Sequence, residues 1–177
     1  MTYRYDLAGD DDVAAIAAVH TLSWRSAYRG HVPDEFLDGD LAGGHLAGWT
    51  QRFADRAGTL TVVARDAGGE VAGFVHTMVD HDPELGSLVD NLHVRPDRKR
   101  SGIGRRLLAE IAARLQDAGA GDRLYLDVIE ANEPARNFYV AVGGKEIGRS
   151  TESFGEHEVP VLVFAWTSLD ALAGPAR

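Results

Sequence analysis

The segment LHVRPDRKRSGIGRRLL, residues 92–108, constrains the fold more than any other part of the sequence. A strand-like run ends at Val94, two glycines follow at Gly102 and Gly104, and a helical pattern then begins. That pattern is carried by apolar residues at helical spacing: Ile103, Leu107, Leu108, Ile111 and Leu115. Glycines let a backbone approach a ligand closely, and the free N–H groups of a helix start attract anions. The segment therefore predicts an anion site between a strand and a helix.

The charge of this loop is opposite to that of the chain. The 177 residues carry a formal net charge of -9, yet six Lys and Arg side chains stand between residues 95 and 106 against the single carboxylate of Asp97. Six minus one gives +5 locally, so the other residues sum to -14. A basic patch this local suits a small polyanion, whereas nucleic-acid binding needs a broad basic face.

Two familiar anion motifs are absent from the loop. A Rossmann fingerprint needs a third glycine three residues after the second, and that position is Leu107. A P-loop needs Gly-Lys-Ser or Gly-Lys-Thr after four intervening residues, and neither is present. Taken alone, Gly-x-Gly is also compatible with a plain turn before an exposed basic helix start. The loop by itself leaves both interpretations open.

The composition excludes several kinds of site and location. The chain has no cysteine, which rules out disulfides, thiolate metal sites and a cysteine nucleophile. Its seven histidines are scattered without ligand spacing, so no metal is predicted. The first residues are acidic, and no run approaches the ~18 apolar residues of a membrane span. We therefore expect a cytoplasmic protein with no nucleic-acid and no membrane partner.

Hydrophobic periodicity predicts an α/β fold, a mixed sheet with helices on its faces. The expected order is β-α-α-β-β-β-α-β-α-β-β, in one domain over residues 1–168 with a frayed tail over 169–177. The second helical region, residues 33–53, is interrupted by glycines. In the strand before the glycine loop, a period of two predicts one shared face for Leu88, Asp90, Leu92 and Val94.

Two motifs together resemble the GNAT superfamily, the Gcn5-related N-acetyltransferases. The first is Arg/Gln-x-x-Gly-x-Gly/Ala after a strand that ends in Val-x-Pro, and here it reads Lys99-x-x-Gly102-x-Gly104. The second is Asn-x-x-Ala-x-x-x-Tyr followed by glycine, and it is carried by Asn132, Ala135, Tyr139 and Gly143. The expected order of elements matches over residues 3–166. Lys99 departs from the pattern, because lysine keeps the charge of arginine but lacks its forked geometry.

The resemblance implies a GNAT-type domain whose anion is acetyl-CoA. Residues 92–94 would line the acetyl and pantetheine arm, the backbone of residues 100–105 would wrap the pyrophosphate, and Asn132 would contact the pantetheine. The implied cofactor-binding residues are Leu92, His93, Val94, Lys99, Arg100, Ser101, Gly102, Ile103, Gly104, Arg105, Asn132 and Tyr139. The implied reaction is transfer of the acetyl group to a primary amine by direct attack, with the backbone N–H of Val94 as oxyanion donor.

Tyr139 takes the position of the general acid in this resemblance. A phenol with a pKa near ~10 is protonated at neutral pH and can give its proton to a forming thiolate. Taken alone, beside Phe138 on a short helix, Tyr139 would be a core aromatic; its place seven residues after Asn132 favours the functional role. Asn132 suits a helix N-cap, a preferred role of asparagine that is compatible with ligand contact.

The reaction also needs a base, because an ammonium has no lone pair to attack with. Asp127 lies five residues before Asn132, where the ribosomal-protein N-terminal acetyltransferases place a glutamate base. A carboxylate within such a strand needs a reason. Asp90 on the neighbouring strand is the rival, and Glu130 and His93 are further candidates. We expect His93 to pack or to form a hydrogen bond on the opposite strand face. Each candidate can also be structural, so the base stays open between Asp127 and Asp90.

The acceptor is not readable from the sequence. By resemblance, Trp24 and Tyr28 are substrate-binding candidates, although with Phe36 they could equally pack the first two helices. The acidic turn at residues 80–84 could draw a cationic amine to the pocket mouth. Small-molecule amines and peptide amines both remain open, as does a non-catalytic acyl-CoA sensor of the same fold. The edge of the C-terminal hairpin could pair with a second copy to give a homodimer.

Overall fold

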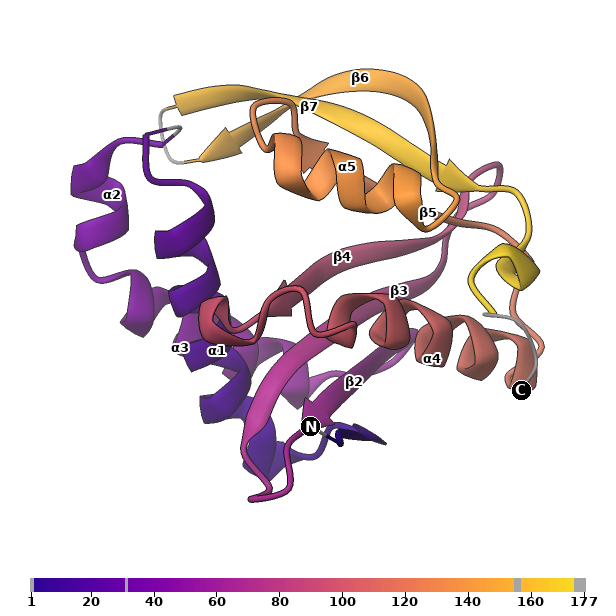
Figure 1. The fold of residues 1–177 in the computed structure, drawn as a ribbon, viewed down its shortest axis with the longest axis horizontal. Helices are drawn as coiled ribbons and strands as arrows, with labels where there is room; N and C mark the ends of the chain where they lie inside the picture. The colour runs from indigo at the N-terminus through magenta and orange to yellow at the C-terminus, as the bar shows by residue number, and fades with distance from the viewer. Residues whose placement is uncertain (1, 31, 155–156, 174–177) are drawn as a thin grey trace.

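The computed structural model describes residues 2–30, 32–154 and 157–173, and it is built on a seven-stranded sheet (Figure 1). The sheet has the order β1-β2-β3-β4-β5-β7-β6, in which β4 and β5 are the parallel pair. The strands are β1 Arg4–Leu7, β2 Thr59–Arg65, β3 Val71–Asp82, β4 Gly86–Val94, β5 Leu124–Ile129, β6 Lys145–Phe154 and β7 His157–Trp166. The helices are α1 Val13–Ala27, α2 Asp34–Asp38, α3 Leu41–Ala54, α4 Ile103–Asp117 and α5 Glu133–Ala141. The expected mixed α/β class is confirmed.

Helices cover both faces of the sheet, and alternate strand residues divide between the two covers. On one face, α1 and α3 bury Ile16, Trp49 and Phe74 completely. On the other face, α4 and α5 enclose the largest core cluster, to which Val75 belongs. Phe74 and Val75, adjacent on β3, thus point to opposite sides of the sheet. These sides are called the α1 face and the α4 face below.

β4 and β5 pair only where they begin and then diverge. Ser87 pairs with Leu124 and Leu88 with Tyr125, and no later pair joins the two strands within the described residues. Figure 1 shows the gap that follows, with α4 below it and α5 above it. β5 continues along β7 instead. The later part of β4 therefore has one edge without a strand partner, and its backbone groups on that edge remain available to a ligand.

A β-bulge in β4 places Asp90 outside the regular alternation of the strand. Thr77 of β3 pairs with Val89, while the preceding residue His76 pairs with Asn91. Asp90 is therefore an extra residue with no partner on β3. A bulge of this kind shifts the alternation of the strand by one residue. Val89 and Asn91 consequently point to opposite faces, although a period of two would put them on the same one.

The bulge corrects the shared face expected for Leu88, Asp90, Leu92 and Val94. Leu92 and Val94 remain together and pack on the α4-face core. Leu88 pairs with the β3 residue that points to the α1 face, so it lies on the opposite side. The Asp90 carboxylate accepts a long contact from Arg52 of α3 at 3.4 Å, which turns it toward the α1 face. The expected single face is therefore wrong.

The glycine-interrupted region before β2 folds as two helices rather than one. α2 ends at Asp38 and α3 begins at Leu41, with Gly39 and Asp40 between them. The Asp40 carboxylate accepts a hydrogen bond from the Gly43 N–H at 3.0 Å and caps α3. The expected order gains one helix and keeps its strands. Among the described residues, none of the helices has the length and apolar character needed to cross a membrane.

The C-terminal segment is more ordered than expected. Residues 169–171 form a short 3₁₀ turn, and Leu169 and Leu172 are buried in the core beneath α4. The Leu169 N–H also donates to the Asp122 carboxylate at 3.0 Å. The frayed tail expected over 169–177 is therefore wrong for its first residues, and 174–177 lie outside the described residues. β6 forms an edge of the sheet, and its pairing with a second copy stays a prediction.

Candidate active site

The loop between β4 and α4 presents a row of unpaired backbone donors. The amides of residues 100–105 donate no hydrogen bond within the described part of the chain, and Arg106 is the first to do so, to the Gly102 carbonyl at 3.0 Å. Gly102 is the N-cap of α4 with φ 84°, and Arg100 also has a positive φ of 63°. Left-handed residues in such a turn form anion-binding concavities from successive N–H groups. The predicted anion site therefore has its donors in place.

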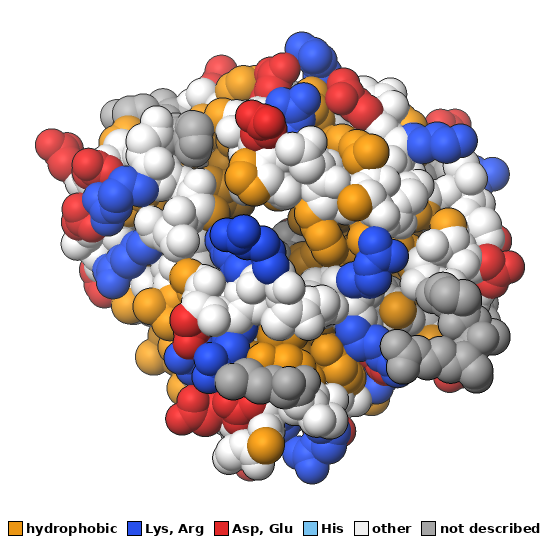
Figure 2. Space-filling model, viewed as in Figure 1, with side chains coloured by type: hydrophobic (Ala, Val, Ile, Leu, Met, Phe, Trp, Pro, Cys, Tyr) orange, Lys and Arg blue, Asp and Glu red, His pale blue; other side chains and the backbone are white. Residues whose placement is uncertain are grey.

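These donors face a pocket of about 1120 Å³ in the opening between β4 and β5. Its walls come from the end of α1, from β4, from the loop and first turn of α4, from β5 and from α5. Figure 2 shows a hollow in this face of the molecule, with apolar side chains inside and Lys and Arg side chains around it. A cavity of this size can enclose an extended ligand together with a second small molecule.

The two sides of the pocket carry opposite charge. The loop and the first turn of α4 contribute Arg98, Lys99, Arg100 and Arg105. The strands contribute Asp90 and Asp127. Asp127 pairs with Val163 of β7, whereas its neighbours Leu126 and Val128 belong to the α4-face core, so its side chain lies on the α1 face. A polyanion on the α4 face and a cation on the α1 face could therefore meet through the opening.

Tyr139 buries its ring in the core and also lines the pocket. The ring packs against Phe164 and Trp166 of β7, and the side chain is only 8% exposed. Its hydroxyl forms no hydrogen bond within the described residues. Burial raises the pKa of the Tyr139 phenol well above its ordinary value, and neighbouring Tyr28 raises it further. At neutral pH the pocket thus contains a protonated hydroxyl with no protein partner.

Asn132 and Arg105 connect the pocket to α5. The Asn132 side chain accepts a hydrogen bond from the Ala135 N–H at 3.2 Å, so the N-cap role is confirmed. Its side-chain nitrogen has no acceptor among the described residues, and Asn132 also lines the pocket. The Arg105 guanidinium donates to the Ala141 carbonyl at 3.0 Å and ties the first turn of α4 to the end of α5.

The two carboxylates of the α1 face have different surroundings. Asp90 accepts hydrogen bonds from its neighbour Asn91 at 2.6 Å and from Arg52 at 3.4 Å. Asp127 has no hydrogen bond and no ion pair within the described residues. Partial burial raises the pKa of Asp127 above its ordinary value. Asp127 is therefore the more available proton acceptor of the two.

The two further base candidates, His93 and Glu130, contact other side chains of the protein. The ring of His93 lies on the α1 face, as expected, where its Nδ1 is 3.1 Å from the Ser23 hydroxyl. Burial lowers the pKa of His93 to about 3. The ring is therefore neutral near pH 7 and is too weak a base to hold a proton taken from an amine. The Glu130 carboxylate pairs with Arg149 at 3.1 Å and does not line the pocket among the described residues.

Gly104 lets the first turn of α4 approach α5 closely, a contact that the sequence did not indicate. A Cβ at this position would stand 3.2 Å from the Phe138 ring. The first turn of α4 thus packs directly on α5, and both residues line the pocket. A glycine expected to admit a ligand also brings the two helices together. Phe138, which the sequence analysis named only as the neighbour of Tyr139, is part of the wall.

The structure brings together most, but not all, of the predicted site residues. Of the cofactor-binding set, only Ser101 is missing from the pocket lining among the described residues; its hydroxyl donates to the Arg98 carbonyl at 2.6 Å. Tyr28 lines the pocket, and burial followed by the charge of Glu152 raises its pKa to about 12. Trp24 does not line it and packs with Tyr28, Phe36 and His45 between the helices. Sequence reasoning missed Ser23, Ala27 and Asn91, which line the α1 side.

The chain is similar to known proteins in both sequence and fold. Residues 16–143 match the model of the Acetyltransferase (GNAT) family. The Uncharacterized N-acetyltransferase YuaI of Bacillus subtilis is 27% identical over 168 residues, which cover 92% of this chain and 91% of that protein. The Streptothricin acetyltransferase of Streptomyces lavendulae is 33% identical over 108 residues, 57% of this chain and 56% of that protein. The crystal structure of PaiA N-acetyltransferase from Thermoplasma acidophilum in complex with coenzyme A has a TM-score of 0.73 at 18% identity, covering 92% of this chain and 98% of that chain.

Proposed function

Since the chain belongs to the GNAT family of acetyltransferases, we propose that it transfers the acetyl group of acetyl-CoA to a primary amine by direct attack. The observation that carries the proposal is the arrangement of the pocket. A protonated Tyr139 hydroxyl and an unpaired Asp127 carboxylate line the same pocket while belonging to opposite faces of the sheet. An acid on the donor side and a base on the acceptor side suit acyl transfer across the opening.

The donor side fits coenzyme A through its own backbone. The free N–H groups of residues 100–105 would hold the pyrophosphate, supported by the dipole of α4. Asn132 has a free amide nitrogen for a carbonyl of the pantetheine arm. Lys99 and the nearby arginines supply charge rather than geometry, so the substitution of lysine for the usual arginine should matter little.

The backbone of β4 supplies the oxyanion donor. The Arg95 N–H donates to the Ala72 carbonyl on β3 at 2.9 Å. Because N–H groups alternate in direction along an antiparallel pair, the N–H of Val94 points to the other edge of β4. That edge faces the opening, and Val94 lines the pocket. A fixed N–H at this point stabilises charge on a thioester carbonyl oxygen as the amine attacks.

Three groups of this chain then carry out the two proton transfers and stabilise the developing negative charge. Asp127 accepts the proton that the attacking amine must lose, directly or through a water. The Val94 N–H stabilises the oxyanion of the tetrahedral intermediate. Tyr139 donates its proton to the departing thiolate. Desolvation keeps Tyr139 protonated and makes Asp127 more basic than an exposed aspartate, which suits each to its role.

Substitution of Gly104 tests the donor site. Gly104→Val adds a branched side chain where the backbone must approach the pyrophosphate and where a Cβ already meets the Phe138 ring at 3.2 Å. We expect the affinity for acetyl-CoA, measured by calorimetry, to fall about tenfold or more, which is about 1.4 kcal/mol. Salt should weaken wild-type binding as well, because part of the attraction is between exposed charges.

The matched control is Gly44→Val in α3, where an added Cβ meets nothing within 4 Å. It imposes the same change on a helical glycine outside the pocket, so acetyl-CoA affinity should stay at the wild-type value. Circular dichroism establishes that both variants are folded. An unchanged affinity in a folded Gly104→Val variant would show that the loop does not hold the pyrophosphate.

A further inference from the structure

Three histidine rings stack against one another on the α1 face, and the proposed mechanism uses none of them. His20 of α1 is the middle ring and is only 6% exposed. The His45 ring of α3 stacks parallel to it, with 3.8 Å between the ring centroids, and the centroid of the His93 ring of β4 lies 4.5 Å away. The stack therefore joins two helices to the strand that carries the oxyanion donor.

The middle ring is held neutral in one tautomer. Trp49 has a single N–H and no acceptor, and it donates to His20 Nδ1 at 3.0 Å. Nδ1 of His20 is therefore bare, and the proton of the neutral ring is on Nε2, which is buried and has no partner among the described residues. A second proton has only Nδ1 to enter, where it would face the Trp49 N–H. Protonation of His20 thus breaks a buried hydrogen bond and adds an unpaired charge.

The outer ring on α3 has the opposite tautomer. The Thr21 hydroxyl donates to the Ala17 carbonyl at 2.9 Å, so the ring is the donor in its contact with His45 Nδ1, which is also 2.9 Å long. A further proton on His45 would therefore enter at Nε2, on a ring that already stacks on His20. Two charged rings at that spacing repel each other. The stack is therefore compact only while its rings are neutral.

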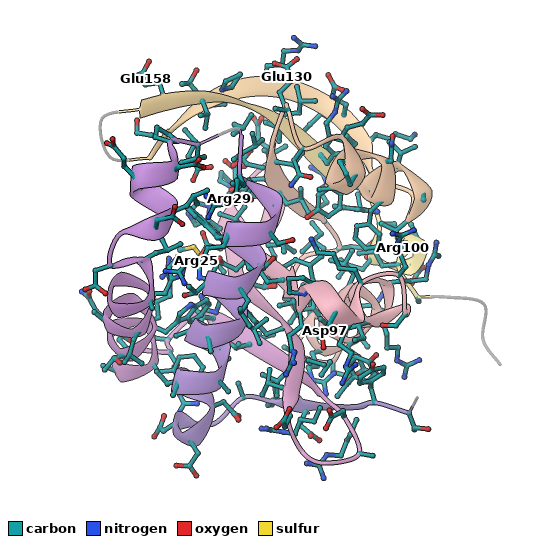
Figure 3. All side chains as sticks on the ribbon, turned by 60° about the vertical axis from the view of Figure 1, so that its left-hand side comes forward. Arg25, Arg29, Asp97, Arg100, Glu130 and Glu158 are labelled. Atoms are coloured by element: carbon teal, nitrogen blue, oxygen red, sulfur yellow. The ribbon has the colours of Figure 1, made fainter. Side chains whose placement is uncertain are left out.

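The groups packed around the two helical rings oppose protonation. Burial lowers the pKa of His20 well below its ordinary value, and the neighbouring His93 and His45 lower it further. Burial also lowers the pKa of His45 to about 4, with smaller effects of two cations, Arg52 of α3 and Arg25, which is labelled on α1 in Figure 3.

The remaining charged neighbours come from the two strands and the loop after β4. For His93, the positive charge of Lys99 adds to the effects of burial and of His45. On β3, burial lowers the pKa of His76 to about 4, and Asp90 is the carboxylate that acts against it. Among the described residues, no carboxylate pairs with any of the three stacked rings. A proton taken up by the stack therefore has no counter-ion.

His93 connects the stack to the pocket. Its Nδ1 is 3.1 Å from the Ser23 hydroxyl, and both residues line the acceptor side. His93 directly precedes Val94, in the part of β4 that has no strand partner on its far edge within the described residues. The end of β4 is therefore held by β3 on one edge and by α1 on one face.

We propose that His20, His45 and His93 form an acid-sensitive clamp, which positions the Val94 N–H and the acceptor wall while the rings are neutral and releases them when the rings take up protons. For its effect on turnover, this inference rests on the proposed function. A free imidazole has a pKa of about 6.5, and the clamped rings have lower pKa values, so the released state binds more protons below that pH. The clamp is closed above about pH 6.5 and weakens as the pH falls toward about 4.

Hydrogen exchange measures the clamp without any turnover. A freed imidazole is about ten-elevenths protonated at pH 5.5, so each released ring raises the opening equilibrium about tenfold relative to pH 7.5. After correction for the intrinsic pH dependence of exchange, the amides of α1 and of the end of β4 should therefore open about tenfold more or better at pH 5.5, whereas those of α4 should not. An equal pH dependence on the two faces of the sheet would overturn the proposal.

His45→Phe identifies the rings responsible, and His81→Phe is its matched control. Phenylalanine keeps a ring to stack on His20 but takes up no proton, and the Thr21 hydroxyl keeps its bond to the Ala17 carbonyl. His81 is an exposed histidine at the end of β3, outside the stack. Both variants remove one imidazole. We expect His45→Phe to reduce the pH effect on exchange by about tenfold and His81→Phe to retain it. Equal effects of the two variants would contradict a specific clamp.

Ring-nitrogen chemical shifts test the same point on the wild-type protein, without a substitution. NMR spectra at pH 7.5 should show His20 protonated at Nε2 and His45 protonated at Nδ1. Both rings should still be neutral in the folded protein at pH 5.5. A cationic ring at either position, with hydrogen exchange unchanged, would overturn the proposal.

The clamp and the proposed function fail separately. In an active enzyme, His45→Phe should retain a larger fraction of its kcat at pH 5.5, relative to pH 7.5, than the wild type does. Exchange that follows pH in a protein without acetyl transfer would keep the clamp and remove the enzyme. Exchange that is independent of pH in an active enzyme would remove the clamp alone.

Discussion

Tyr139→Phe should lower kcat by about 10²-fold or more while acetyl-CoA binding stays intact. The ring packs against Phe164 and Trp166 and fills the same space in the variant, so the core should survive. The substitution removes only the hydroxyl, which forms no hydrogen bond with the described residues and meets the departing sulfur. KM for acetyl-CoA should change little, because the lost interaction belongs to the transition state. Release of free thiol from acetyl-CoA measures the rate.

Tyr5→Phe is the matched control for this experiment. Tyr5 lies on β1 outside the pocket, and its hydroxyl can be removed without touching any residue of the proposed mechanism. It should keep the wild-type kcat. If Tyr139→Phe also turned over at nearly the wild-type rate, Tyr139 would be a core residue and the general acid would have to be assigned to another group.

Asp127→Asn should lower kcat/KM by about 10²–10⁴-fold, the usual contribution of a general base. The sign of its pH dependence follows from the desolvation of Asp127, which raises its pKa. The wild-type rate should fall as the pH drops through that raised pKa, because a protonated carboxyl cannot accept another proton. The difference between wild type and variant should be largest near neutral pH, where Asp127 is ionised and the amine is mostly protonated, and it should shrink at low pH, where Asp127 itself is protonated. Rates across a pH series with saturating acetyl-CoA measure the effect.

Two comparisons separate a base at Asp127 from a structural aspartate. Asp90→Asn removes the rival carboxylate, which Asn91 and Arg52 already hold, and it should cost less activity than Asp127→Asn. Thermal unfolding is the second comparison. The Asp127 side chain is exposed and has no partner among the described residues, so Asp127→Asn should leave Tm nearly unchanged. A larger loss of activity in Asp90→Asn would transfer the role to Asp90.

The sequence was most informative where one local pattern decides the structure. The strand, Gly-x-Gly and helix start around Gly102 and Gly104 depend on nearest neighbours, and the free amides are where the pattern predicts them. The N-cap at Asn132 is equally local. The roles assigned to Tyr139 and Asp127 remain predictions, although the structure brings both residues to the pocket.

The features that the sequence did not predict depend on contacts between distant parts of the chain. The bulge at Asp90 exists only in the register of β4 against β3, and no property of the β4 sequence alone announces it. The position of Asp127 on the α1 face depends in the same way on its neighbours Leu126 and Val128, which pack into the α4-face core. Leu169 and Leu172 are buried because α4 leaves space for them. Without knowledge of that space, the short segment around Leu169 and Leu172 is typical of a frayed tail.

The most direct test of the account is amine-dependent release of coenzyme A by the wild-type protein. Purified protein is mixed with acetyl-CoA and each of a panel of primary amines, free thiol is followed over time, and the amine is examined by mass spectrometry. The account predicts that, for at least one amine, thiol release requires both the protein and the amine and that one acetyl group appears on the amine for each thiol released. Tight binding of acetyl-CoA with no amine-dependent thiol release, across monoamines, diamines and peptide N-termini alike, would contradict it and indicate an acyl-CoA-binding protein without turnover.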